Sequence, residues 1–217
     1  AQEVIDSKRF EFMNDSINNV YAYRNLSYIE KMARHEYVSS LYVYDLKEGR
    51  SDLFFKNLAS CECVIAEGRK ASIYSGMGQD LDIRSKNWFE TPAGSATEYV
   101  NKYMRGTQIP LLKLSEMYLI AAEGWMEDDP GHAAELLQTF KQARTQKEVV
   151  SQEVTEDVIM REIRKEFIGE GVIFLTYKRL HHDIWGNTSE DQVKADNNVF
   201  VFPIPEDEIE YGNRTQN

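Results

Sequence analysis

The sequence predicts a mostly helical fold with irregular loops and a few short strands. Two apolar stripes with helical spacing follow one another between residues 110 and 143, separated by an Asp-Asp-Pro-Gly turn. A third, strongly charged helix is predicted after residue 155. Residues 1–105 are instead punctuated by glycine and proline, a pattern typical of loops. We therefore expect a loop-rich region over 1–105 and a helical region over 106–217.

The first predicted helix begins at Pro110, because proline fits the first helical position at little cost. Its apolar stripe consists of Leu111, Leu114, Tyr118, Ala121 and Trp125. The turn at residues 128–131 ends this helix. The second stripe consists of Ala133, Leu136, Leu137, Phe140 and Ala143.

Two amphipathic helices joined by so short a turn should pack antiparallel, in the shape of one tetratricopeptide-like hairpin. A solenoid needs at least about three such units to bury its faces. Only one hairpin is visible in the sequence, so we expect an upstream tetratricopeptide-like part to be missing from this chain.

The third helix is expected to begin after Thr155, whose side chain can cap the first turn. Ile159, Ile163 and Phe167 form its predicted buried stripe. The predicted opposite face carries Arg161, Glu162, Arg164, Lys165 and Glu166. Gly169 and Gly171 then allow a sharp turn.

The remaining segments are less regular. Residues 40–45 and 51–55 are predicted to be short strands or extended segments. Residues 172–177 are either a strand or a buried helical turn, and residues 199–204 form a short extended segment. Pro205 is predicted to start a last helical turn in which Ile209 packs inward.

Three of these segments, in this order, resemble the C-terminal half of the SusD/RagB family, cell-surface lipoproteins of Bacteroidetes that capture nutrients, usually glycans. The matching motifs are Ile109–Glu123 (IPLLKLSEMYLIAAE), Glu162–Arg179 and Pro203–Asn217. The sequence departs from the family pattern at Ile173 and Thr176. A weaker upstream match includes Asp82-Ile83-Arg84, which resembles an Asp-x-Arg strand of the family, and residues 99–103.

The resemblance implies that residues 1–217 are a single SusD-like C-terminal region. It also implies non-catalytic binding of an oligosaccharide at the outer face of the outer membrane, and delivery of that ligand to a SusC-like TonB-dependent transporter. The membrane would be reached only through a lipid anchor on a missing N-terminus. No cofactor is implied.

The net charge of -11 agrees with this expectation. Phosphate binding needs a basic face, so the charge argues against a nucleic-acid partner. It also argues against simple adsorption to anionic lipid. No apolar run of the sequence approaches the length needed to span a bilayer.

The acids of the helical region are predicted to brace the fold rather than to catalyse. Carboxylates beside guanidinium groups can form bidentate pairs that fix one element against another. The expected network consists of Glu116, Glu123, Glu162, Glu166 and Glu170 with Arg161, Arg164, Lys178 and Arg179.

Sugar binding requires aromatic rings on loops, because the apolar face of a pyranose stacks on Trp or Tyr while polar groups bind its hydroxyls. By this rule the candidate ligand-binding residues are Trp88 and Phe89, ahead of Pro92 and Gly94, together with Tyr74 and Trp185. Packing in the core is the alternative role for each of the four.

The sequence offers little support for metal binding or catalysis. Adjacent residues such as His181 and His182 point in different directions, so they seldom bind one metal ion. The Cys61–Cys63 pair is at best half of a metal site. We therefore predict no metal, cofactor or catalytic residue. A binder of peptides or other nutrients is the main alternative, and a glycosidase, which needs two carboxylates about 5–9 Å apart, is a more distant one.

Overall fold

A computed structural model describes residues 1–12, 34–43, 64–65, 68–75, 82–91, 98–100, 102, 108–145, 148–186, 191–212 and 215. The predictions for residues 51–55, for Cys61 and Cys63, and for the chain end at 213–214 and 216–217 lie outside these residues. The chain divides into two compact units, Ala1–Gly169 and Glu170–Asn217, which are described separately. The division into regions at residue 105 stays a prediction.

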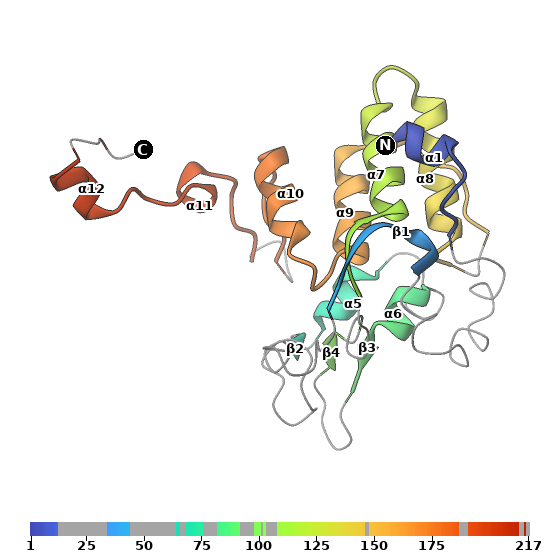
Figure 1. The fold of residues 1–217 in the computed structure, drawn as a ribbon, viewed down its shortest axis with the longest axis horizontal. Helices are drawn as coiled ribbons and strands as arrows, with labels where there is room; N and C mark the ends of the chain where they lie inside the picture. The colour runs from blue at the N-terminus through green and yellow to red at the C-terminus, as the bar shows by residue number, and fades with distance from the viewer. Residues whose placement is uncertain are drawn as a thin grey trace. The chain divides into compact units, whose positions relative to one another are not determined.

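The described residues confirm a fold of helices with irregular segments and a few short strands (Figure 1). The first unit contains α1 (Gln2–Asp6), β1 (Tyr37–Tyr42), β2 (Val64–Ile65), α5 (Arg69–Ile73), α6 (Ile83–Asn87), β3 (Phe89–Glu90), β4 (Glu98–Val100), β5 (Gln108–Lys113), α7 (Leu114–Gly124), α8 (Pro130–Gln142) and α9 (Glu156–Glu166). The second unit contains α10 (Val172–Leu180), α11 (Asn197–Phe200) and α12 (Glu206–Glu210).

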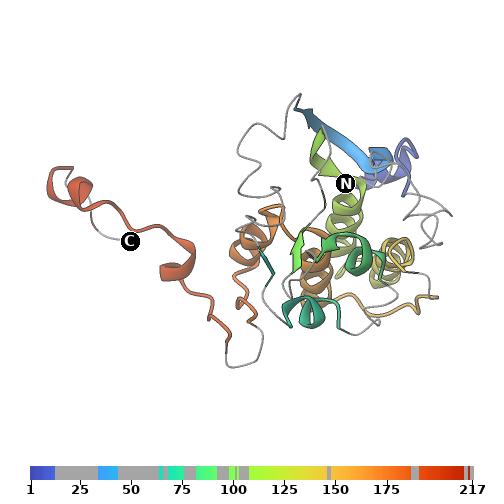
Figure 2. The same ribbon diagram turned by 90° about the horizontal axis from the view of Figure 1, so that it is seen from below.

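Helices α7 and α8 form the predicted antiparallel hairpin, and they lie side by side in both ribbon views (Figures 1 and 2). The Asp129 carboxylate accepts a hydrogen bond from the His132 N–H at 3.0 Å, which caps α8 directly before Pro130. Ala122, Ala133 and Phe140 are fully buried. Small residues on both helices, Ala122 and Ala133, allow the two helices to pack against each other.

The prediction of a helix starting at Pro110 is wrong, because residues 108–113 form strand β5. This strand pairs antiparallel with β1, placing Pro110 opposite Ser40 and Ile109 opposite Leu41. In a two-stranded sheet both strands are edge strands, where a proline without an N–H is tolerated. Helix α7 begins only at Leu114, so Leu111 lies outside the helical stripe and is half exposed.

A second sheet of three antiparallel strands has the order β2-β4-β3. Ile65, Tyr74 and Phe89 form a buried cluster beside it, with Trp88 partly buried against the cluster. Asp82-Ile83-Arg84, expected as a strand, instead starts a helix. The Asp82 side chain accepts from the Arg84 N–H at 3.0 Å and so caps α6.

Helix α9 confirms the predicted cap and buried stripe. Thr155 Oγ1 accepts from the Val158 N–H at 3.3 Å, and Ile159 and Phe167 are buried. The charged face predicted opposite this stripe is largely buried. Arg161 is exposed, whereas Glu162, Arg164, Lys165 and Glu166 are buried. These charged side chains face a polar interior built by distant segments of the chain.

Gly169 adopts the left-handed backbone conformation, with φ of +77°, as the predicted sharp turn requires. A Cβ at this position would also lie 3.3 Å from Val100 Cγ1. Both the conformation and the close approach favour glycine here.

In the second unit, residues 172–177 belong to α10, so the helical alternative is the correct one. The segment 199–204 begins inside α11 and is non-helical only after Phe200. Helix α12 follows Pro205 as predicted, with Ile209 partly buried. Within the parts of the chain described above, no helix has the length and apolar character needed to cross a membrane.

Candidate functional site

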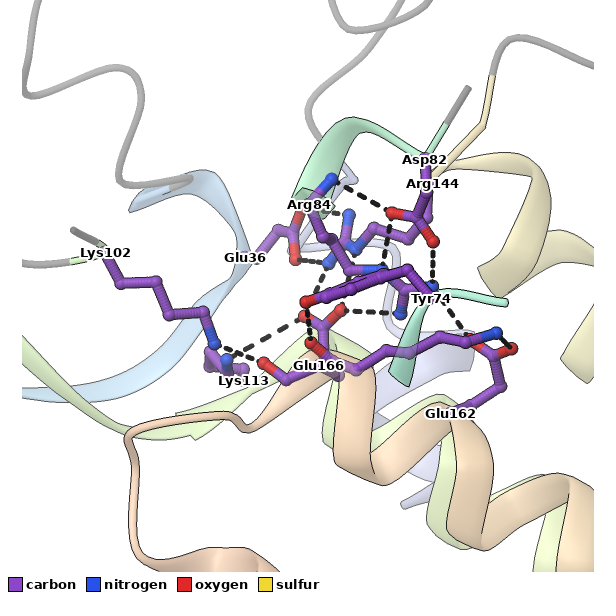
Figure 3. A network of polar contacts seen from close by, with 10 residues as sticks. Glu36, Tyr74, Asp82, Arg84, Lys102, Lys113, Arg144, Glu162 and Glu166 are labelled. Carbon is purple, nitrogen blue, oxygen red and sulfur yellow. Dashed lines mark hydrogen bonds and ion pairs between the residues drawn. The ribbon is translucent and has the colours of Figure 1, made fainter. Parts of the chain in front are cut away.

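A cluster of charged side chains lies inside the first unit, between α9 and several segments that precede it (Figure 3). We call it the buried charge network. All of its members are less than one-tenth exposed. It consists of Glu36, Asp82, Arg84, Lys102, Lys113, Arg144, Glu162, Lys165 and Glu166.

Glu166, the last residue of α9, is the centre of this network. Its carboxylate accepts from Arg144 Nε and Nη2, each at 3.0 Å, and from Arg84 Nη1 at 3.3 Å. Lys113 Nζ lies 3.8 Å from it. The Arg144 guanidinium also binds Glu36 through two hydrogen bonds of 3.0 and 2.6 Å. Arg144 therefore forms bidentate pairs with two carboxylates, one 108 residues before it and one 22 residues after it in the sequence.

Arg84 is the second bridging guanidinium. It donates to both Asp82 oxygens, at 3.0 and 2.7 Å, and to Glu162 Oε2 at 2.9 Å. Glu162 also accepts from Lys165 Nζ at 2.8 Å. Helix α6 is thereby fixed against α9 by paired charges rather than by apolar contacts alone.

The electrostatics of the network keep its groups ionised. Burial raises the pKa of Glu166, but Arg144, Lys113 and Arg84 more than compensate, so its pKa lies well below the usual range. The pKa of Glu162 is lowered in the same way, mainly by Arg84. Burial alone would lower the pKa of the Arg84 guanidinium, yet Asp82 and Glu162 raise it well above its ordinary value.

The C-terminus of α9 is satisfied by side chains from far away in the sequence. The Tyr74 hydroxyl donates to the Lys165 carbonyl oxygen at 2.9 Å, and Lys102 Nζ donates to the Glu166 carbonyl oxygen. These carbonyls have no partner within their own helix. A cation near a helix C-terminus is also favoured by the helix dipole.

The network confirms a bracing role for Glu162 and Glu166. Their basic partners described above, Arg84, Arg144, Lys113 and Lys165, are not among the four predicted ones. Arg161 is exposed and lies 3.9 Å from Asp157 on its own helix. The partners that sequence reasoning missed are Arg84, Arg144, Lys113 and Glu36. A signal for Arg84 was present in the Asp-x-Arg motif, whereas a lone Arg144 after an amphipathic helix carries no such signal.

Tyr74 and Phe89, two predicted ligand-binding residues, lie in the buried cluster. Tyr74 is 1% exposed and Phe89 is 8% exposed, and their rings meet edge to face with centroids 5.8 Å apart. Burial raises the pKa of the Tyr74 hydroxyl well above its ordinary value. Contact between a ligand and either ring would require this cluster to open.

Trp88, the third candidate, follows α6 directly. Its side chain is partly buried, and Lys102 Nζ lies 3.9 Å from its ring centroid. The structure thus brings Trp88, Phe89 and Tyr74 together, with only Trp88 at the edge of the buried cluster.

Trp185, the fourth candidate, belongs to the second unit and is partly buried there. Its ring lies edge to face with His182, at 4.8 Å between centroids, and with Tyr177, at 6.5 Å. Its backbone N–H donates to the Tyr177 hydroxyl at 3.3 Å. Trp185 is therefore held by aromatic neighbours from its own unit.

The residues on either side of His182, His181 and Asp183, have roles in the local structure of the second unit. Asp183 accepts from Lys194 Nζ at 2.5 Å and from the Ala195 N–H at 2.9 Å. These two bonds lower the pKa of the Asp183 carboxyl. His181 ends α10 in the left-handed conformation. Among the residues that the structure describes, no three His, Cys, Asp or Glu side chains are grouped to hold a metal ion.

Comparison with solved structures identifies the fold. Two SusD superfamily proteins are similar to this chain. The first, from Bacteroides thetaiotaomicron VPI-5482, has a TM-score of 0.62 and 23% identity over 84% of this chain and 48% of its own. The second, from Bacteroides vulgatus ATCC 8482, has a TM-score of 0.65 and 21% identity over 100% of this chain and 52% of its own.

A third structure, from Bacteroides vulgatus ATCC 8482, carries a name that proposes sugar binding. It has a TM-score of 0.65 and 22% identity over 84% of this chain and 45% of its own. No protein-family model and no curated protein sequence matches the chain. The chain spans about half the length of the solved structures that it matches. This chain therefore has the SusD-like fold that its sequence motifs predicted.

Proposed function

We propose that this chain is part of a non-catalytic, cell-surface protein that binds an oligosaccharide and delivers it to a SusC-like TonB-dependent transporter. The observation that carries the proposal is the likeness of the fold to two SusD superfamily proteins and to a third protein named for sugar binding. The protein would lie at the extracellular face of the outer membrane, held there by a lipid anchor.

The arrangement of charges supports binding rather than catalysis. A glycosidase needs two carboxylates that reach the substrate from opposite sides. The four acids of the buried charge network, Glu36, Asp82, Glu162 and Glu166, are each at most 3% exposed and bound to guanidinium groups. A general acid needs a raised pKa, whereas the pKa values of Glu162 and Glu166 are lowered. These four side chains suit a scaffold.

Trp88 and Trp185 remain the proposed ligand contacts, because each keeps part of its side chain at the surface. Both rings are held by neighbouring side chains, Trp88 by Lys102 and Trp185 by His182 and Tyr177. A ring that is already fixed loses little conformational freedom when a ligand stacks on it.

The decisive experiment measures retention of the protein on an array of oligosaccharides beside an array of peptides. We expect retention by at least one oligosaccharide and none by the peptides. Retention by peptides alone would replace the proposal with a peptide-uptake function. Analysis of the bound oligosaccharides for shortened products would reveal hydrolysis, and any shortening would end the non-catalytic interpretation.

Two variants sharpen this experiment, and a third serves as their control. Trp88→Ala and Trp185→Ala should each weaken retention about five- to tenfold if the ring stacks on a sugar. Trp125→Ala is the matched control, because its indole N–H is bound to Gln2 on α1 at 3.2 Å, away from both candidate rings in the sequence. Unchanged retention with an unchanged melting temperature would remove that tryptophan from the proposed ligand contacts.

The transporter partner is tested separately. Purification of the tagged protein from outer membranes of its native host should bring down a large β-barrel protein encoded beside its gene. Recovery of the protein alone under mild detergent would argue against delivery to such a transporter and would leave sugar binding untouched.

A further inference from the structure

Trp88 and Lys102 form a stacked pair at the edge of the buried charge network. Lys102 Nζ lies 3.9 Å from the Trp88 ring centroid, within the range where an aromatic quadrupole attracts a cation. The Lys102 side chain is 8% exposed, and its ammonium donates to the Glu166 carbonyl oxygen. The ammonium is therefore fixed, and the part of the ring that it covers is closed to a ligand.

The backbone of Trp88 is fixed from a second direction. Its N–H donates to the Arg84 carbonyl oxygen at 3.0 Å, at the end of α6. The Arg84 guanidinium in turn binds the Glu166 carboxylate. The ring and the backbone of Trp88 are thus both connected to Glu166, through Lys102 and through Arg84 respectively.

We infer that Lys102 is a positioning residue for Trp88 and that this pair selects neutral sugar rings over cationic ones. The inference rests on the proposed sugar-binding function and names the ligand class of one of its two candidate contacts. An ammonium on one face of an indole already interacts with the ring quadrupole, so the ring attracts a second cation on its other face less strongly. A protonated amino sugar would also meet a like charge across the thickness of the ring.

A neutral pyranose is not repelled by the Lys102 ammonium. Its apolar face is held mainly by contact area and dispersion, which a cation on the far side of the ring leaves intact. The Lys102 ammonium also restricts the motion of the indole, so less freedom is lost when the sugar stacks. The same contact therefore favours a neutral ring and disfavours a cationic one.

The test uses two ligands with the same sugar backbone: oligomers of N-acetylglucosamine, which are neutral, and the deacetylated oligomers, which at mildly acidic pH carry an ammonium in place of each acetamide. Binding is measured at physiological ionic strength, where a Debye length of about 8 Å limits attraction to the net charge of -11. The measured quantity is the ratio of the two affinities in the wild type, in Trp88→Ala, in Lys102→Met and in Lys102→Arg.

The wild type should favour the neutral oligomer by about two- to fivefold more than Trp88→Ala does. Lys102→Arg keeps a cation over the ring and should preserve this preference, whereas Lys102→Met should remove it. Equal ratios in the wild type and Trp88→Ala would overturn the inference, as would an unchanged ratio in Lys102→Met or binding of neither ligand by the wild type. If Lys102→Met does not fold, the comparison of the wild type with Trp88→Ala decides by itself.

A second measurement needs no ligand. In a Trp125→Phe/Trp185→Phe background Trp88 is the one remaining tryptophan, because the chain contains three. Adding Lys102→Met should shift its emission and increase its quenching by acrylamide, whereas adding Lys102→Arg should not. Unchanged emission and quenching would overturn the positioning role. Failure of every sugar on the array, together with a shifted emission, would instead refute the proposed function and leave the positioning role intact.

Discussion

The two units of the chain are stabilised by different kinds of contact. In residues 1–169 several buried polar contacts join segments that are far apart in the sequence: Arg144 binds Glu36, 108 residues away, and Tyr74 binds the Lys165 carbonyl, 91 residues away. In the second unit the hydrogen bonds described above are local. The Tyr177 hydroxyl accepts from the Trp185 N–H eight residues on, and Lys194 binds Asp183 eleven residues back.

This difference predicts different responses to damage. A contact between distant segments forms only when most of the unit has folded, so its loss should weaken the whole unit. A local contact requires only its own neighbourhood, so its loss should be felt only there. The following predictions test this contrast.

Glu166→Gln should have the largest effect, because it removes the shared negative partner of Arg144 and Arg84 while leaving both guanidinium groups buried. Breaking a buried ion pair on one side typically costs about 3–5 kcal/mol of unfolding free energy. Urea unfolding followed by circular dichroism would measure this loss. A change below about 1 kcal/mol, the range of exposed ion pairs, would contradict the bracing role.

Acid should have the second largest effect, because it protonates carboxylates of the buried charge network and so destabilises the first unit. The pKa values of Glu162 and Glu166 are lowered in the folded state, so their stabilisation is fully present above the unfolded-state value of about 4.3. It is lost as the pH falls below that value toward the folded pKa values. Thermal unfolding scans at decreasing pH should show a falling melting temperature in this window. A flat profile there would mean that the two acids are not held ionised by their partners.

Thr155→Ala should cost about 1 kcal/mol, because it removes the side-chain cap from the first turn of α9. Thr155→Ser is the matched control, since it keeps the hydroxyl and should be nearly neutral. Urea unfolding of the two variants side by side provides the measurement. Equal losses in both variants would show that the methyl group matters and the cap does not.

Tyr177→Phe should have the smallest effect, and a local one. It removes the hydroxyl that accepts from the Trp185 N–H, a bond of a type worth about 0.5–1.5 kcal/mol. Hydrogen exchange should speed up at the Trp185 amide while the amides of α7, α8 and α9 keep their protection. Loss of protection in those helices would contradict the contrast between the two units.

The sequence predicted features that depend on nearby residues, and it failed where a feature depends on a distant segment. The Thr155 cap, the turn ahead of Pro130 and the stripe through Phe140 depend on residues a few positions apart, and all three are present. The helix predicted to start at Pro110 fails because its residues pair with β1, about 70 positions upstream. Local preference favoured a helix there, and a distant partner strand overrode it.

The candidate site shows the same limit. Glu162 and Glu166 were predicted to form ion pairs that brace the fold, but the sequence did not identify the partners that bury them. Their burial depends on Arg84 and Arg144, whose distance in space cannot be obtained from spacing along the chain. Aromatic residues near glycine and proline suggested loops, yet Phe89 is packed beside Tyr74 in a buried cluster. Only the folded chain separates a surface ring from a core ring.

The position of Glu36 has a practical consequence for work with shortened chains. An excised helical portion that starts at residue 108 would look self-sufficient, because it keeps the α7–α8 hairpin and α9. It would also retain Arg144 while discarding Glu36, and retain Glu162 while discarding Arg84. Such a truncation would leave Arg144 and Glu162 with only part of their partners, so expression trials that trim the amino-terminal side should stop before residue 34.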